Sequence, residues 1–110
     1  MRKDDQLFLG HILDAANHAT NLVRGKSRDD LNHHMALRFA LPHLVQIIGE
    51  AARRLSAEFM ADHPEIPWKT MIGMRHKIVH DYFGVDMDLV WKTVTEELPP
   101  LLSKLQKIVP

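Results

Sequence analysis

Residues 41–59 read LPHLVQIIGEAARRLSAEF, and apolar side chains recur in them at spacings of 4, 3, 4, 3 and 4 residues. The residues on this repeat are Leu41, Val45, Ile48, Ala52, Leu55 and Phe59. Such spacing places one apolar stripe along a helix, which is typical of a buried seam or a helix–helix interface. We therefore expect one long helix from about residue 28 to residue 61.

Two residues inside this stretch disfavour a regular helix. Pro42 predicts a kink or a break near residues 38–42, because its ring clashes with a carbonyl of the preceding turn. Gly49 costs about 1 kcal/mol relative to Ala in a helix interior. We expect that cost to reflect the close approach of another helix at this point.

The chain before this segment also has helical periodicity. A first helix is expected over about residues 4–24, and Gly25 is suited to end it. Ser27 is expected to begin the next helix as its N-cap, because Asp30 stands three residues later in the capping-box position.

After the long segment, turn and cap signals divide the rest of the chain. The sequence HPEIP at residues 63–67 is a strong helix breaker, and a third helix follows over about residues 68–82. Asp86 is a suitable N-cap for a fourth helix over about residues 87–98. The two prolines at 99–100 are expected to interrupt it before a short last helix.

The fold class follows from these elements. No stretch alternates apolar and polar residues with period two between turn signals, so strands are not expected. We predict an all-α bundle of four main helices plus a short C-terminal helix, as a single domain over residues 1–110.

Composition excludes several classes of function. Lys plus Arg (14) equals Asp plus Glu (14), which excludes a strongly basic nucleic-acid coat but leaves room for a local basic site. The absence of Cys excludes disulfides, thiolate zinc ligands and a thiol nucleophile. The longest stretch free of charged side chains, residues 39–49, is too short to span a bilayer. The N-terminal sequence MRKDD lacks the apolar core of a signal peptide, so we expect a cytoplasmic protein without membrane contact.

Chemistry-bearing residues are concentrated in one string, GMRHKIVHDYF, at residues 73–83. Arg75 and Tyr82 are seven residues apart and share a helix face, and His76 and His80 are i,i+4 neighbours. Arg75 and His80 lie about 140° apart around a helix. They converge only if the helix loosens, if the Arg side chain wraps around, or if a second copy faces the first.

An Arg and a His suit metal-independent cleavage of a phosphodiester. A guanidinium offers fixed donors to a phosphate, and an imidazole transfers protons near neutral pH. Cleavage needs both an acid and a base, and one His per chain supplies only one of them. A two-fold dimer that faces two Arg/His pairs into one cleft would supply both. The structural alternative is that basic residues favour a helix C-terminus and that Asp81 pairs with Lys77 or Arg75.

The string from Gly73 to Phe83 resembles the signature of HepT-like toxins, a branch of the HEPN superfamily. Their motif is Arg, four residues, His, one residue and Tyr, matched here by Arg75, His80 and Tyr82. The segments IGEAA (48–52), PEIPW (64–68) and VDMDLVW (85–91) also resemble family landmarks, so the resemblance covers essentially the whole chain. It implies a HEPN-like helical bundle.

The resemblance also implies a function. Such proteins are homodimeric, metal-independent endoribonucleases without cofactors, and they are the toxins of type VII HepT/MntA toxin–antitoxin systems. By this resemblance Arg75 and His80 are the catalytic residues acting on RNA (tRNA or mRNA). Tyr82 is the site at which an MntA-like minimal nucleotidyltransferase antitoxin attaches AMP. Its bulk and charge would fill the cleft and occupy Arg75.

This chain departs from the family pattern at one position. The family usually has Asn directly after the motif Arg, where this sequence has His76. His76 could replace that Asn in positioning the substrate, add a second acid/base group or mark a weakened enzyme. We assign His76 and Lys77 to substrate positioning, and expect Lys69 to join Arg75, Lys77 and the histidines in a local basic patch. The alternative is a catalytically silent HEPN-like module that binds a nucleotidyltransferase partner.

The other candidates have structural explanations. Trp68 and Trp91 are expected to pack in the core or an interface rather than to stack on bases. Glu50 with Arg53 or Arg54 is expected to form a solvated face or a dimer ion pair, although Glu50 could also support catalysis. No H-E-x-x-H is present and no metal is expected, although His76 and His80 have the spacing of a ligand pair. Surface or capping roles are expected for His11, His18, His33, His34, His43 and His63.

Overall fold

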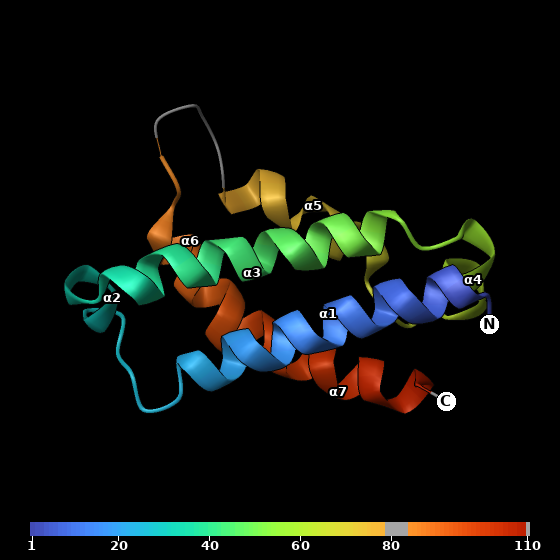
Figure 1. The fold of residues 1–110 in the computed structure, drawn as a ribbon, viewed down its shortest axis with the longest axis horizontal. Helices are drawn as coiled ribbons and strands as arrows, with labels where there is room; N and C mark the ends of the chain where they lie inside the picture. Colours follow the sequence, from blue (N-terminus) through green and yellow to red (C-terminus); the bar gives the residue numbers. More distant parts are fainter. Residues whose placement is uncertain (79–83, 110) are drawn as a thin grey trace.

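Two long antiparallel helices, α1 (Lys3–Leu22) and α3 (Met35–Arg53), run the length of the molecule in the computed structural model, which describes residues 1–78 and 84–109 (Figure 1). Helix α5 (Trp68–Ile78) packs against α3. The other elements are α2 (Asp30–His33), α4 (Ala57–Asp62), α6 (Met87–Lys92), the π-helical turn η1 (Thr93–Glu97) and α7 (Leu98–Ile108). The described residues contain no β-strand, which confirms the all-α prediction.

The predicted seam is the centre of the core. All six of its side chains, from Leu41 to Phe59, are at most 6% exposed. They join apolar residues of α1, α5 and α7 in one cluster, and full burial of a Leu or Ile side chain contributes about 1.5–3 kcal/mol. Trp68 belongs to the same cluster, and its indole N–H donates to the carbonyls of Met60 and His63. The expectation that Trp68 packs in the core is confirmed.

The prediction of one long helix over residues 28–61 was wrong, because the segment contains three helices. The first break falls at His34, whose backbone leaves the helical region (φ −131°, ψ 88°). No break occurs near residues 38–42, since Pro42 lies buried inside α3. A proline inside a helix gives up one hydrogen bond, and here the helix continues through that loss.

The second break is made by a contact that joins distant parts of the chain. Ser56 caps α4 by accepting from the N–H of Phe59 (3.1 Å). Asp5 of α1 in turn accepts from the Ser56 N–H (2.8 Å) and from its hydroxyl (2.7 Å). Asp5 is 2% exposed, so a buried carboxylate fixes the point at which the chain leaves α3 and starts α4.

Replacing Asp5 is expected to destabilise the fold. Asp5→Ala should lower the free energy of unfolding by about 2 kcal/mol, because the Ser56 N–H and hydroxyl lose their acceptor. Urea denaturation measures the loss. Asp4→Ala is the matched control, since Asp4 is an exposed acidic residue in the same first turn. Equal losses in the two variants would mean that the helix dipole, not the Ser56 contact, accounts for the effect.

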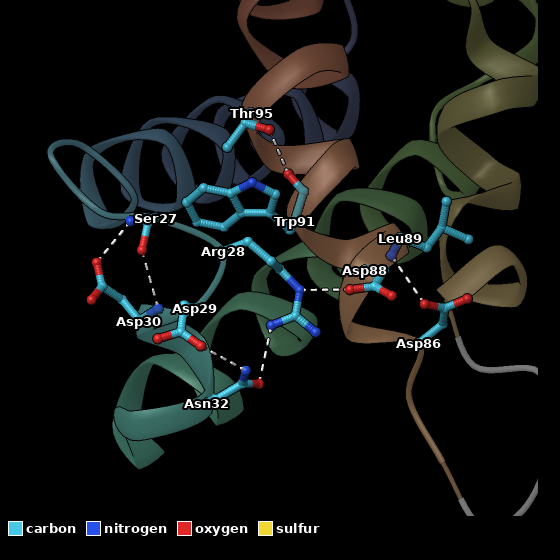
Figure 2. A network of polar contacts seen from close by, with 10 residues as sticks. All are labelled: Ser27, Arg28, Asp29, Asp30, Asn32, Asp86, Asp88, Leu89, Trp91 and Thr95. Carbon is cyan, nitrogen blue, oxygen red and sulfur yellow. Dashed lines mark hydrogen bonds and ion pairs between the residues drawn. The ribbon is translucent and has the colours of Figure 1, made fainter.

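The glycine signal between α1 and α2 is confirmed, but the prediction that Ser27 is the N-cap of the next helix was wrong, because α2 begins at Asp30 and its N-cap residue is Asp29. Gly25 has a positive φ of 75°, a conformation that favours glycine. The Ser27 N–H donates to Asp30 (2.7 Å) and the Asp30 N–H donates to the Ser27 hydroxyl (3.4 Å), as Figure 2 shows. The hydrogen bond from the Ser27 backbone lowers the pKa of the Asp30 carboxyl. Its contribution to stability is therefore present at neutral pH and lost as the pH falls through that lowered pKa.

The C-terminal part forms one helical run instead of two separated helices. Asp86 caps α6 by accepting from the Leu89 N–H (3.1 Å), as predicted. The predicted interruption at 99–100 was wrong, because these prolines occupy the first turn of α7, where no intrahelical N–H bond is needed. The π-helical turn η1 connects α6 to α7. None of the helices in the described part of the chain has the length and apolar composition to span a membrane.

Candidate active site

The backbones of α3 and α5 come into contact at Gly49. A Cβ atom at this position would lie 3.3 Å from the carbonyl oxygen of Met71 and 3.5 Å from that of Ile72. The expected close approach of another helix at Gly49 is thus confirmed. It brings the outward side chains of the two helices to opposite sides of a shared groove.

This groove has a volume of about 240 Å³ and is lined by Gly49, Glu50, Arg53, Lys69, Ile72, Gly73, Arg75 and His76. Three of its side chains are cationic and one is a carboxylate, which leaves a charge of +2 with the imidazole neutral. The chain as a whole has no net charge. The groove is therefore a local basic site of the kind that the overall composition left open.

Glu50 bridges the two arginines of the groove. Its Oε2 lies 2.9 Å from Nη2 of Arg53, and its Oε1 lies 3.5 Å from Nη1 of Arg75. The side chains are 40–65% exposed, so these ion pairs contribute little to stability. Their effect is positional, because one carboxylate from α3 holds the motif arginine of α5 at the groove.

The residues assigned to substrate positioning are separated by the helix. His76 lines the groove beside Arg75. Lys77 is not among the lining residues, and its Nζ lies 3.6 Å from Oε1 of Glu97 in η1. The other oxygen of Glu97 is buried and has no hydrogen-bond partner among the described residues. The basic patch expected from the sequence therefore includes Lys69, Arg75 and His76, while Lys77 is held by a carboxylate of its own.

His80 and Tyr82 lie outside the described residues, and a hydrogen bond joins the residues that flank their segment. The N–H of Asp86 donates to the carbonyl of Ile78 (2.9 Å), so the end of α5 is joined to the start of α6. Arg28 also bonds to Asp88 of α6 (2.7 Å), which ties α6 to the connection between α1 and α2 (Figure 2).

The remaining histidines lie at the surface. His11, His18 and His43 are exposed on α1 and α3, where they line two further shallow grooves between these helices. His33 pairs with Asp29 (3.5 Å), and His63 is partly covered by Phe59. In the described residues no three His, Asp or Glu side chains are grouped as metal ligands.

The sequence did not indicate that Arg53, Ile72 and Gly73 line the groove. A signal for Gly73 was present, because Lys69, Gly73 and His76 are spaced four and three residues apart and so share one face of α5. The convergence of Arg53 with Arg75 has no signal in the sequence. It depends on the packing of α5 on α3.

Substitutions at the two groove glycines should have opposite effects on stability. Gly73→Ala is expected to raise the free energy of unfolding by about 0.5–1 kcal/mol, because a Cβ there meets nothing within 4 Å. Gly49→Val should lower it by about 1–3 kcal/mol, because its methyl groups press on the α5 backbone. Urea denaturation of both variants tests this; destabilisation by Gly73→Ala would contradict the open space above it.

Comparisons with known proteins agree on one family. The model of the ribonuclease HepT-like family matches residues 12–108, so the chain belongs to that family within the HEPN superfamily. The chain is 36% identical over 108 residues to a probable ribonuclease HepT of Thermococcus cleftensis, covering 98% of each protein. It is 36% identical over 107 residues to a candidate RNase of Caldanaerobacter subterraneus subsp. tengcongensis, covering 97% of this chain and 96% of the relative. No solved structure matches the chain significantly.

Proposed function

We propose that this protein is a metal-independent endoribonuclease and the toxin of a type VII HepT/MntA toxin–antitoxin system. The observation that carries the proposal is the position of Arg75. Its guanidinium is half exposed at a basic groove and is held there by Glu50 from another helix. Family membership and relatives named as ribonucleases support RNA as the substrate.

In the proposed mechanism Arg75 binds the scissile phosphate and His80 transfers a proton. Among the described residues only Glu50 contacts the guanidinium, and its other N–H donors would offset the negative charge that develops on the phosphate. His80 takes the proton of the 2′-hydroxyl as its oxygen attacks phosphorus. The 5′-oxygen leaves with a proton from a second imidazole, which yields a 2′,3′-cyclic phosphate and a 5′-hydroxyl. Arg75 supplies the positive charge that a metal ion supplies in other nucleases.

The second imidazole is proposed to come from a second copy of the chain in a homodimer. The outward face of α3 offers a surface for it, because Phe39 is 72% and Met35 71% exposed. Phe39, His43, Ile47 and Glu50 follow one another at spacings of four, four and three, on one side of the helix. Two copies that pair along this face would bring their Glu50–Arg75 contacts toward one another.

Tyr82 is proposed to be the control point of the enzyme. An MntA-like nucleotidyltransferase antitoxin would transfer AMP to its hydroxyl, which adds bulk and a negative phosphate. That phosphate would compete with RNA for Arg75. His76, beside Arg75 at the groove, is proposed to orient the substrate in place of the Asn that the family usually has there, and Lys77 would add positive charge once released from Glu97.

Two observations favour the catalytically silent alternative. Lys77 is engaged by Glu97, and His76 stands where the family usually has Asn, so neither residue assigned to substrate positioning is in a substrate-ready arrangement. A silent module would still bind a nucleotidyltransferase partner.

An assay of the unmodified protein separates the two functions. EDTA-treated protein is incubated with labelled tRNA and mRNA, after intact-mass measurement has excluded an adduct on the chain. The proposal expects cleavage that leaves 2′,3′-cyclic phosphate ends. Absence of cleavage by the adduct-free protein would overturn the nuclease and leave the binding module. Cleavage only after a divalent metal is restored would overturn metal independence alone.

A further inference from the structure

We propose that the α3–α5 groove holds a second phosphate of the RNA strand, next to the one bound by Arg75, with Lys69 as the residue that binds it. The inference rests on the proposed function for the identity of the polyanion. It adds a binding subsite formed by residues outside the Arg–His–Tyr motif.

The position of Lys69 is the first argument. It stands in the first turn of α5, where the helix dipole disfavours a positive charge. Among the described residues no carboxylate lies within ion-pair distance of it, in contrast to Arg53, Arg75 and Lys77. A lysine at this position therefore does not stabilise the helix. Binding of an anionic ligand in the groove would explain its presence.

Two glycines leave the groove open between its charged side chains. Gly49 and Gly73 both line it and carry no side chain. Gly49 is required by the helix contact, but a Cβ at Gly73 would meet nothing within 4 Å. Packing thus does not explain the glycine at 73, which costs about 1 kcal/mol in a helix relative to Ala. An open path between Lys69 and His76 does explain it.

The spacing of the cations is the third argument. Lys69 precedes Arg75 by six residues, which is about 9 Å along the helix axis. One phosphate held by the guanidinium of Arg75 would leave the ammonium group of Lys69 free for another. The groove therefore fits a strand with successive phosphates better than a mononucleotide, and Arg53, held by Glu50 on the opposite wall, faces the same path.

A binding experiment tests the subsite without depending on cleavage. The probe is a short, fluorescein-labelled 2′-O-methyl RNA, which lacks the attacking hydroxyl and stays intact whether or not the protein is a nuclease. Its affinity is measured by fluorescence anisotropy over a range of salt concentrations. Lys69→Gln is compared with the parent and with Lys104→Gln, which removes an exposed lysine of α7 outside the groove. Gly73→Leu keeps every charge and fills the groove instead.

The expected result is a loss of affinity of about 3- to 10-fold for Lys69→Gln, with the slope of log K against log salt reduced by about 0.7. Gly73→Leu should weaken binding as well, and Lys104→Gln should bind like the parent. These results without cleavage of ordinary RNA would uphold the groove and overturn the nuclease. Parent-like binding by both groove variants, or no binding by the parent, would overturn the subsite even if RNA is cleaved.

Discussion

Arg75→Ala and His80→Ala are each expected to slow RNA cleavage by about 10²- to 10⁴-fold. Arg75→Ala removes the donors that offset charge on the phosphate, and it also leaves Glu50 beside an empty position. His80→Ala removes the group that we propose to transfer the proton. Initial rates at saturating RNA measure the chemical step, with far-ultraviolet circular dichroism as the check on folding.

Three matched variants make this result specific. Arg75→Lys keeps the charge but loses the bidentate donors, so it should recover only part of the activity. Arg24→Ala removes an exposed arginine that forms no ion pair with the described residues, and it should cleave like the parent. His76→Asn restores the residue that the family usually has and should retain activity. Cleavage that survives His80→Ala but is lost in His76→Ala would show that His76, and not His80, transfers the proton.

Phe39→Glu is expected to separate the proposed dimer and to lower cleavage by about 10-fold or more, because each copy loses the second imidazole. The side chain is 72% exposed in one copy, and an Ile- or Phe-sized side chain buried in an interface contributes about 1.5–3 kcal/mol in each copy. Two buried carboxylates facing each other would add a larger penalty. Light scattering after size-exclusion chromatography measures the mass, and the cleavage rate is measured at the same concentrations.

Val109→Glu is the control for the proposed dimer, since Val109 is an exposed apolar residue directly after α7, and the C-terminal end of α7 lies away from the start of α3 (Figure 1). It should change neither the mass nor the rate. A monomeric Phe39→Glu variant that cleaves like the parent would show that one chain supplies both acid and base. A variant that remains dimeric would place the interface elsewhere.

The sequence predicted the parts of the fold that depend on local patterns. The apolar repeat from Leu41 to Phe59 identified the core, and Gly25 and Asp86 marked helix ends through their own backbone preferences. The break at Ser56 could not be predicted in this way, because Leu55 and Phe59 keep the helical spacing across it. What ends the helix there is a carboxylate 51 positions earlier in the chain, and no local pattern records that contact.

The site was predictable to a similar degree. The motif string pointed to Arg75, and the cost of Gly49 pointed to a helix contact, both from local sequence. That the two features meet, and that Glu50 and Arg53 thereby reach the motif arginine, is a result of tertiary packing. Glu50 was recognised as a possible supporting residue, but its partner could be identified only once α5 was placed on α3.

The hydrogen bond from the Asp86 amide to the Ile78 carbonyl gives the molecule a built-in reporter. This amide joins the two ends of the segment that carries His80 and Tyr82, so it exchanges its hydrogen with solvent only when that junction opens. The rate of deuterium uptake at this amide therefore reports how often the junction opens, independently of the exchange rates of the core amides. If bound RNA or an attached AMP group stabilises the junction, the Asp86 amide exchanges more slowly. If either one opens the junction, the amide exchanges faster.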